Sequence, residues 1–239
     1  MRIESRDFKA LLFDLDGTLY KQSMIRRRMA GRLLKSCLAQ PMQGWKVLRG
    51  LGAYRQAQEE LRRSPGNGDG IADQQLQLAS RRTGLPVEEL RQMVALWMEE
   101  RPLDLLAGAM WEGLEAVLAG AKQRGLRLGV VSDYPAEKKL EVMGLRGYFE
   151  TVVTAQDAEV QRFKPDARSL EVALHRLNTR PEDALYIGDR PEVDAEAARR
   201  AGVACAILDP EGRQSNGDWL VFSSYPELGN VIRGERREH

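Results

Sequence analysis

Hydrophobic and polar residues follow two different patterns along the chain, and the pattern changes after Pro102. An apolar run at Ala10-Leu11-Leu12-Phe13 predicts one short buried strand over residues 8–14. From about residue 20 to about residue 107, apolar residues recur at the spacing of amphipathic helices, with no convincing strand. Downstream of Pro102, apolar runs typical of strands alternate with helical segments.

The stretch from residue 20 to residue 107 predicts four helices. The first ends at Pro41, the second reaches the loop at 64–70, the third covers 71–82, and the fourth starts near Pro86. One apolar stripe is expected on the first helix: Ile25, Met29, Leu33, Leu34, Cys37 and Leu38. Three large residues are expected in the core of this helical block rather than against a ligand: Trp45, Trp97 and Met98.

The part of the chain after residue 107 predicts an α/β fold. Strands are expected at 126–131, 151–154, 184–187 and 203–208, with a last edge strand at 219–222. Helices are expected between them, at 113–123, 137–143, 167–177 and 194–201, and a short helix near the end. This alternation favours a parallel sheet with helices on both faces. We therefore divide the chain into an α/β core, residues 1–19 and 108–239, and an inserted all-helical domain, residues 20–107.

Composition and net charge give no indication of a nucleic-acid or membrane partner. The chain has 239 residues, of which 43% are hydrophobic and 30% charged, as is typical of a soluble globular protein. The formal net charge of +1 provides no overall field to attract nucleic acid or a membrane surface. No apolar run approaches the roughly 20 residues that span a bilayer, and the N-terminus lacks the apolar core of a signal peptide. We expect a cytoplasmic protein with neither a nucleic-acid partner nor a membrane partner.

Cysteine and histidine are too scarce to suggest chemistry of their own. Cys37 and Cys205 lie far apart without metal-ligand spacing, which fits a reduced, cytoplasmic protein. The only histidines are His175, inside a helical pattern, and His239, the last residue. Catalysis by histidine is therefore disfavoured.

Two carboxylates follow the first predicted strand at the point where it ends. Asp14 and Asp16 lie there, and Gly17 then breaks the pattern, as a tight turn requires. Removing a carboxylate from water without a partner is costly, so a cation is expected nearby. Mg²⁺ prefers such hard oxygen ligands. A calcium loop or a plain surface loop is the alternative, because Asp-x-Asp-Gly alone does not decide.

Polar residues also follow the second predicted core strand. Ser132 and Asp133 lie at its end, where the Ser132 hydroxyl can either donate to a phosphate oxygen or cap a turn. Further on, Lys164 precedes Pro165 and so lies in extended backbone. Its ammonium can neutralise a phosphate or neighbouring carboxylates, or it can be a solvated surface lysine.

A last acidic pair follows the strand at 184–187. Asp189 comes after Gly188 at the strand end, and Asp194 lies near the start of a helix, which it can cap. Such a pair suits a metal, with one ligand direct and the other through water. Ligands of parallel α/β sheets bind beyond the carboxyl ends of the strands, so all these groups are expected to converge.

Taken together, these clusters resemble the four sequence motifs of the haloacid dehalogenase (HAD) superfamily, in the same order. The matching residues are Asp14-x-Asp16-Gly17-Thr18, Ser132, Lys164-Pro165 and Gly188-Asp189-x4-Asp194. The insertion between the first two motifs resembles the helical cap of the first subclass, as in phosphoglycolate phosphatase-like members. The resemblance implies a Rossmann-like core and a Mg²⁺-dependent phosphatase acting on a small phosphorylated metabolite. We expect a monomer or a homodimer.

The resemblance also implies a role for each matched residue. Asp14 would be the nucleophile that forms an aspartyl-phosphate, and Asp16 would protonate the leaving oxygen and then activate water. Lys164 and Mg²⁺ would keep Asp14 ionised and offset the substrate's charge. The metal ligands would be Asp14, Asp16 through its backbone carbonyl, and Asp189, with Asp194 in support. The phosphoryl group would be held by Thr18, Ser132, Asp133 and Lys164, with backbone N–H groups.

Two residues bear on the choice of chemistry within that superfamily. Its dehalogenases lack an acid at the position of Asp16, so this carboxylate favours phosphoryl transfer. Asp133 stands where many relatives have Asn, and it adds a negative charge that either tunes the site or points away. A phosphomutase, which releases little phosphate, and a binding or regulatory protein on the same scaffold remain the alternatives.

The first half of the predicted cap is strongly basic. Eleven Lys and Arg residues lie between Lys21 and Arg63, against only Glu59 and Glu60. One interpretation is that Arg26 to Arg28 recognise an anionic substrate tail; the favoured alternative is a solvated helix face. We expect the cap to close over the site about hinges at 18–21 and 103–111, excluding water.

Overall fold

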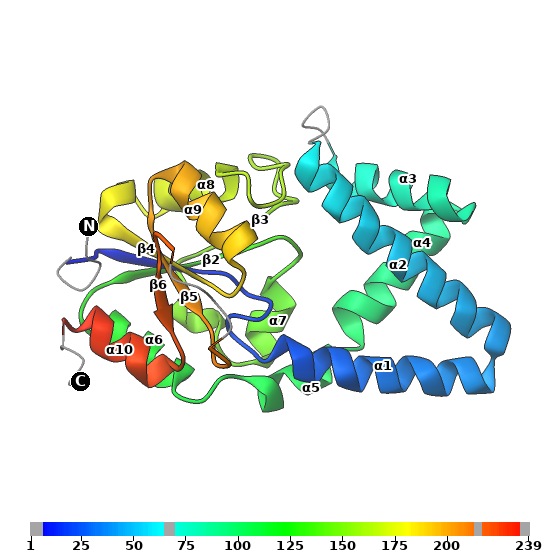
Figure 1. Ribbon diagram of the computed structural model, residues 1–239, viewed down its shortest axis with the longest axis horizontal. Coiled ribbons are helices and arrows are strands. Elements are labelled where there is room, and N and C mark those ends of the chain that lie inside the picture. The colour runs from blue at the N-terminus through cyan, green and yellow to red at the C-terminus, as the bar shows by residue number, and fades with distance from the viewer. Residues whose placement is uncertain (1–6, 65–69, 213–216, 235–239) are drawn as a thin grey trace.

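A six-stranded parallel sheet forms the centre of the protein in the computed structural model, which describes residues 7–64, 70–212 and 217–234. The strand order is β3-β2-β1-β4-β5-β6, and every neighbouring pair is parallel (Figure 1). The strands are β1 Ala10–Phe13, β2 Arg127–Ser132, β3 Thr151–Thr154, β4 Ala184–Gly188, β5 Ala204–Leu208 and β6 Leu220–Phe222. The predicted α/β core is thus confirmed, including β6 as an edge strand.

Helices cover both faces of the sheet, as the alternating pattern predicts. Successive side chains of a strand point to opposite faces. Leu11 and Phe13 of β1 accordingly pack in one apolar cluster with α6, α7 and α10, whereas Ala10 and Leu12 pack in another with α8 and α9 (Figure 1). These helices are α6 Leu114–Gln123, α7 Glu137–Val142, α8 Arg168–Arg176, α9 Glu196–Ala201 and α10 Tyr225–Ile232.

Short helical turns complete the core. The 3₁₀ turns are Arg146–Tyr148 and Pro181–Asp183, and a π-helical turn, Pro191–Ala195, leads into α9. None of the helices in the described ranges combines the length and hydropathy of a bilayer-spanning segment.

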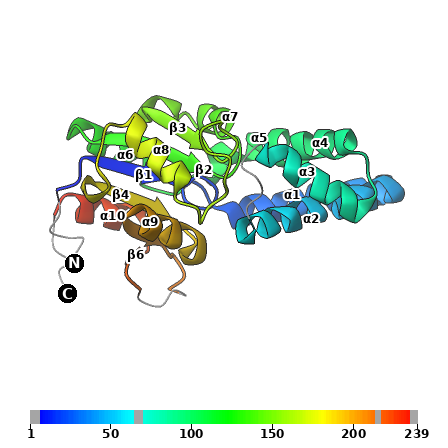
Figure 2. The same ribbon diagram turned by 90° about the horizontal axis from the view of Figure 1, so that it is seen from above.

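All described elements between β1 and α6 are helical. Most of them lie beyond the carboxyl ends of the strands (Figures 1 and 2). They are α1 Gln22–Ala39, α2 Pro41–Arg63, α3 Ile71–Thr83, α4 Val87–Val94, the π-helical Ala95–Glu100, α5 Leu103–Leu106 and the 3₁₀ turn Ala107–Ala109. Pro41 both ends α1 and begins α2, where its missing N–H costs nothing. Of the predicted loop at 64–70, residues 65–69 lie outside the described residues.

The two chain connections between the sheet and the helical part run side by side. The Lys21 N–H donates to the Ala109 carbonyl at 2.9 Å, and the Trp111 N–H to the Leu19 carbonyl at 3.4 Å. Tyr20 forms an isolated bridge with Met110. These contacts fall within the predicted hinges, but the hinge motion and the exact domain boundaries stay predictions.

The structure corrects two expectations about the helical part. Trp45 is 70% exposed rather than part of a core, whereas Trp97 is buried and Met98 partly buried. The apolar stripe of α1 is also only partly covered: Ile25 is buried, but Leu34 and Leu38 are exposed. The reason is that Met29 and Leu33 pack toward Trp97, and no described element covers the neighbouring side of α1.

Candidate active site

The ends of three adjacent strands bring the predicted site residues together. Because β1 pairs in parallel with both β2 and β4, the residues that follow them meet at one edge of the sheet. The Asp14 N–H still donates to the Ile187 carbonyl of β4 at 2.8 Å, which extends the pairing by one residue. Asp14, Ser132 and Asp189 therefore start from neighbouring strand ends.

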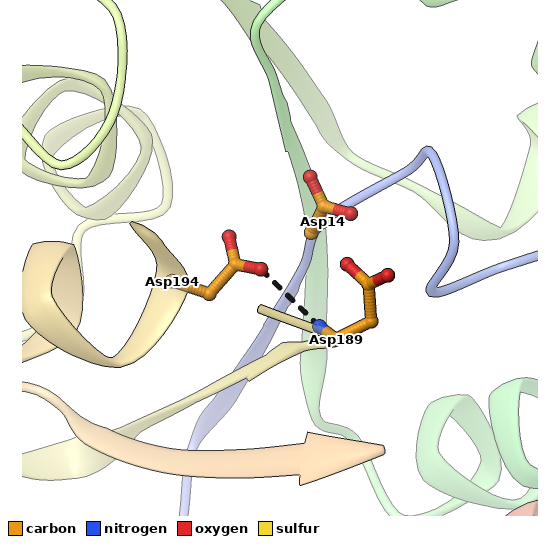
Figure 3. A group of neighbouring side chains, drawn as sticks. All are labelled: Asp14, Asp189 and Asp194. Atoms are coloured by element: carbon orange, nitrogen blue, oxygen red, sulfur yellow. Dashed lines mark hydrogen bonds between the residues drawn. The ribbon is translucent and has the colours of Figure 1, made fainter. Parts of the chain in front are cut away.

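Three carboxylates gather at this edge. Asp14, Asp189 and Asp194 each offer an oxygen within 4.8 Å of the others (Figure 3). Two glycines allow this approach. Gly17 has φ +112°, and a Cβ there would lie 2.2 Å from Asp189 Oδ2; a Cβ on Gly188 would lie 2.5 Å from the Asp194 Cβ. The glycines beside the aspartates thus leave the space that the carboxylates occupy.

Lys164 is the centre of the buried charge network. Its side chain is almost fully buried, and Nζ donates to Asp14 Oδ1 at 2.5 Å and to Asp194 Oδ1 at 2.8 Å. Nζ also donates to the hydroxyl of Tyr186 at 2.8 Å. The peptide bond from Lys164 to Pro165 is cis. The interpretation of Lys164 as a solvated surface lysine is therefore wrong.

Asp194 has donors on both of its carboxylate oxygens. Besides Lys164, it accepts from the Tyr186 hydroxyl at 3.0 Å and from the backbone N–H of Arg190 at 3.0 Å. It also accepts from the backbone N–H of Asp189 at 3.2 Å (Figure 3). It sits in the π-helical turn that precedes α9. A carboxylate so fully bonded to protein is suited to hold its neighbours in place rather than to offer a free oxygen.

Asp189 differs from the other two carboxylates because no donor among the described residues is recorded on its side chain. Burial, with Asp14 and Asp194 close by, raises the pKa of Asp189 to about 8. Burial likewise raises the pKa of Asp14 to about 7, although the Lys164 ammonium opposes the shift. Two carboxyls that resist ionisation side by side indicate a missing positive charge.

A divalent cation fits this arrangement. Oxygen atoms alone form the cluster, and Mg²⁺ binds through one or two carboxylates while keeping several waters. Four carboxylates, counting Asp16, lie here, and the cations that form ion pairs with them are Lys164 and Lys139. Arg26 and Arg190 are also near Asp189 but form no recorded ion pair with it. Asp14 and Asp189 are the residues that would hold the metal directly.

Asp16 lies outside this cluster and has partners of its own. Its Oδ1 accepts from Lys139 Nζ at 2.6 Å and from the Tyr20 hydroxyl. Burial alone would raise the pKa of Asp16, but the Lys139 ammonium and these hydrogen bonds outweigh it, so the pKa is lowered. Asp16 is therefore ionised at neutral pH, and Lys139, with only 8% of its surface exposed, holds it.

Sequence reasoning missed Lys139, Tyr20 and Tyr186. Glu137-Lys138-Lys139 has the composition of a solvated helix face, and Tyr186 looks like an ordinary apolar strand residue. The signal that was available is positional. Lys139 lies in the first turn of a helix that starts shortly after β2 ends, so it faces the same edge of the sheet.

Thr18 and Ser132 are buried next to the cluster but do not line the cavity described below. The Thr18 hydroxyl donates to Asp14 Oδ2 at 2.9 Å, which orients that carboxylate. Ser132 Oγ accepts from the Tyr134 N–H at 3.2 Å, as the turn-capping alternative predicts. Their roles in phosphate binding stay predictions.

Asp133 connects the core to the helical part. Its Oδ2 accepts from Arg62 and, at 3.3 Å, from Gln58 of α2, while Oδ1 accepts from the Lys164 N–H at 3.1 Å. The Arg62 guanidinium matches the negative charge that made Asp133 unusual. A role for Asp133 on phosphate stays a prediction, because protein donors already contact both of its oxygens.

A cavity of about 830 Å³ lies between the carboxylate cluster and the helical part. Asp14, Asp16, Lys164 and Asp189 line its floor. The residues that line it from the helical part include Arg26, Arg55, Arg62, Arg63, Arg82, Trp97 and Met98. Arg27 and Arg28 are not among the lining residues, so only Arg26 of the predicted basic trio faces the site.

Comparison with known proteins identifies the family of this chain. A model of the haloacid dehalogenase-like hydrolase family matches residues 8–202. The chain belongs to this family. Its expected resemblance to HAD members of the phosphoglycolate phosphatase type is confirmed as well.

Two relatives illustrate the extent of the match. Phosphoglycolate phosphatase of Rhodospirillum rubrum is 35% identical over 137 residues, covering 54% of this chain and 56% of that one, so the alignment spans little more than half of the relative. Validoxylamine A 7'-phosphate phosphatase of Streptomyces hygroscopicus subsp. limoneus is 31% identical over 204 residues, covering 84% and 85%.

A solved structure shows the same fold. The HAD hydrolase YfnB of Bacillus subtilis, in a magnesium-bound form, superposes with a TM-score of 0.66 at 16% identity, over 95% of this chain and 100% of that chain. The predicted HAD architecture, a Rossmann-like core with a helical cap, is thereby confirmed. From here on, the helical part of this chain, from α1 to the 3₁₀ turn Ala107–Ala109, is called the cap.

Proposed function

We propose that this HAD protein is a Mg²⁺-dependent phosphatase that hydrolyses a small phosphate monoester through an aspartyl-phosphate. The observation that carries the proposal is the cluster of Asp14, Asp189 and Asp194 around Lys164, at the floor of a cavity. Two of its relatives are named as phosphatases of small phosphorylated molecules, and a structural neighbour holds magnesium.

Asp14 is the proposed nucleophile. Its Oδ1 is held by Lys164 and its Oδ2 by Thr18, which fixes the direction of the carboxylate. In the first step an Asp14 oxygen bonds to phosphorus and the bond to the leaving oxygen breaks. In the second step a water oxygen bonds to phosphorus, inorganic phosphate leaves, and Asp14 is regenerated as a carboxylate. Bound Mg²⁺ would supply positive charge against the negative charge on the phosphoryl oxygens.

Asp16 is the proposed acid and base. It is two residues from Asp14, lines the same cavity, and is kept ionised by Lys139 and Tyr20. An ionised Asp16 is ready to take the proton of the attacking water. For the first step Asp16 must carry a proton, which comes from solvent or from the water it deprotonated in the preceding turnover. It gives this proton to the leaving oxygen, and its contact with Lys139 is weaker while it is protonated.

The cavity wall supports recognition of a further anionic group on the substrate. Arg26 and Arg55 line the cavity, and neither has an ion pair with a described residue. Burial, followed by the proximity of Arg55 and Arg190, lowers the pKa of Arg26, and the carboxylates of Asp189 and Asp16 offset this lowering only in part. The tail-binding interpretation therefore passes to Arg26 and Arg55, while Arg27 and Arg28 fit the solvated interpretation.

Phosphate release tests the proposal. We expect purified protein to release inorganic phosphate from an aryl phosphate, and from members of a panel of phosphorylated metabolites, with Mg²⁺ but not with chelator. Asp14→Asn should lower kcat by roughly 10³-fold or more, since it removes the attacking group. Asp7→Asn, at an exposed aspartate that lies before the first strand and belongs to none of the motifs, is the matched control and should leave the rate unchanged.

Other outcomes identify other functions. Equal rates in Mg²⁺ and in chelator contradict the metal assignment. A protein that transfers phosphoryl groups between sugar phosphates with little net release is a phosphomutase. A protein that binds a metabolite of the panel but never turns it over is a binding or regulatory protein on this fold.

A further inference from the structure

The cap begins with an unusually one-sided run of charge. Between Gly17 and Gln58 there are nine Lys and Arg residues and no Asp or Glu. The remainder of the chain carries 27 Lys and Arg against 35 Asp and Glu. The net charge of +1 therefore conceals a basic segment, α1 and the first part of α2, attached to an acidic remainder.

The same segment carries most of the exposed large hydrophobic residues in the described ranges. Seven large hydrophobic residues are exposed in the described ranges, and five of them lie on α1 and α2. They are Leu34 at 61%, Leu38 at 76%, Met42 at 89%, Trp45 at 70% and Leu48 at 44%. We call these five residues the hairpin tip, because they surround the turn at Gln40 between the two helices. Figure 1 shows that this turn is the point of the α1–α2 hairpin far from the sheet.

Helical spacing places the tip residues on the outer side of each helix. Leu34 and Leu38 are four residues apart on α1, and Trp45 and Leu48 are three apart on α2. The buried residues Ile25 and Val47 belong to the opposite, covered sides. The helices approach closely behind the tip, where a Cβ on Gly44 would lie 2.5 Å from the Cys37 Cα. The tip is thus a surface of a packed hairpin rather than an unfinished core.

Cations lie on the same two helices as the tip. Within the described residues, no ion pair is recorded for Lys35 and Arg49, which follow Leu34 and Leu48 in the chain, or for Arg27 and Arg28, which lie near the other end of α1. Others are neutralised locally, as Arg32 is by Asp104 and Lys46 by Glu89. An apolar tip on a basic segment that has no carboxylate of its own between residues 17 and 58 is complementary to a surface that is anionic outside and apolar inside.

We propose that the hairpin tip binds reversibly to the surface of an anionic lipid bilayer. Trp, Met and Leu side chains would enter the boundary between headgroups and acyl chains, and the cations would face anionic headgroups. Binding strength then grows with both apolar area and charge, and salt weakens it. None of the five tip residues lines the cavity, so this proposal does not depend on the proposed function.

Two other occupants fit the surface less well. A second copy of the chain would bring two basic hairpins together, and neither has a carboxylate between residues 17 and 58 to offset the repulsion. Nucleic acid would be attracted by the cations, but it offers no apolar phase for exposed Leu, Met and Trp side chains. Lipid satisfies both features of the tip at once.

Vesicle sedimentation tests the proposal with the full chain. We expect the protein to sediment with vesicles that contain phosphatidylglycerol, not with vesicles of phosphatidylcholine alone, and to be released by high salt. Tryptophan fluorescence should shift to the blue on binding, and this shift should be lost in Trp45→Phe while the other three tryptophans remain.

Substitutions separate lipid binding from folding and catalysis. Met42→Ser with Trp45→Ser should weaken vesicle binding by about tenfold or more. The matched control is Val142→Ser, at a residue 43% exposed on α7, which should leave binding unchanged. Far-UV circular dichroism and phosphate release should be the same in both variants and the parent.

Three results would overturn the proposal. One is a folded parent protein that does not bind the anionic vesicles, and another is vesicle binding that survives the Met42 and Trp45 substitutions. The third is a different occupant: a dimer in light scattering, or an RNA complex, that the same double variant abolishes while lipid binding is absent.

Discussion

The carboxyl edge of the sheet and the tip of the α1–α2 hairpin handle charge and apolar surface in opposite ways. At the sheet edge, charged groups are buried and nearly all have protein partners: Lys164 contacts Asp14 and Asp194, and Lys139 contacts Asp16. At the hairpin, large apolar residues are exposed, and exposed cations such as Lys35 and Arg49 have no recorded ion pair among the described residues. Each region is incomplete, but what is missing differs.

The difference shows how an unpaired charge or an uncovered apolar surface indicates the kind of partner that binds there. In the carboxylate cluster, Asp189 is half-buried and is the one member with no recorded side-chain donor among the described residues. An unpaired charge in such a place is costly, so the partner that we propose is a small cation. On the exposed hairpin no single group is costly, since water solvates the cations. There the deficit is an apolar area, and the partner it indicates is a surface rather than an ion.

Among the changes that test this comparison, the largest expected effect comes from filling the space at the sheet edge. Gly17→Ala should lower kcat by about 10²-fold or more, because the new Cβ would meet Asp189 Oδ2 at 2.2 Å and displace it from Asp14. Steady-state phosphate release measures the loss.

Gly125→Ala is the matched control for backbone strain. Gly125 also has a positive φ, +77°, but a Cβ there meets nothing within 4 Å. It should cost roughly 1–2 kcal/mol in unfolding free energy and leave kcat unchanged. Similar kcat losses in the two variants would mean that strain, and not the approach of Asp189 to Asp14, explains the Gly17 effect.

These glycines also indicate what a sequence can predict. Asp14, Lys164, Asp189 and Asp194 follow from their places at strand ends, because parallel pairing forces the ends of β1 and β4 together whatever the side chains do. The strands and most helices follow for the same reason: period and breaker residues are local signals. Periodicity even finds the short edge strand β6.

Contacts between helices and the core do not follow in this way. Lys139 and Arg62 look like any solvated lysine and arginine until packing turns them toward Asp16 and Asp133. The exposure of one side of α1 and α2 could not be predicted either, for the opposite reason. Apolar spacing predicts that Leu38 and Trp45 could be buried, but only tertiary structure decides whether a neighbour covers them.

A smaller expected effect is the pH dependence of the stabilisation by Mg²⁺, which tests whether the carboxylate cluster lacks a cation. The pKa values of Asp14 and Asp189 are raised by folding, to about 7 and about 8, so the metal-free folded state binds protons that the unfolded state releases. Its stability from these groups is therefore present at pH 4 and is lost as pH rises toward 8. Mg²⁺ competes with those protons, so it should stabilise the protein more at pH 8 than at pH 5.

Thermal unfolding with and without Mg²⁺ measures this difference. At saturating Mg²⁺ we expect the Tm to rise by about 5–10 °C at pH 8 and by much less at pH 5. Asp189→Asn should remove most of the increment at pH 8, and Asp7→Asn should keep it. An increment that is independent of pH would show that Mg²⁺ binds somewhere other than these carboxylates.

The smallest effects compare two residues of α1 that share the apolar stripe. Ile25 is buried and Leu38 is 76% exposed. Ile25→Ala should lower the free energy of unfolding in urea by about 2–4 kcal/mol, since it empties packed space, whereas Leu38→Ala should change it by no more than about 0.5 kcal/mol. A loss above about 1.5 kcal/mol for Leu38→Ala would mean that the tip is covered within the protein itself. If Leu38→Ala instead leaves the free energy of unfolding nearly unchanged and weakens vesicle binding, then Leu38 contributes to lipid binding and not to the stability of the fold.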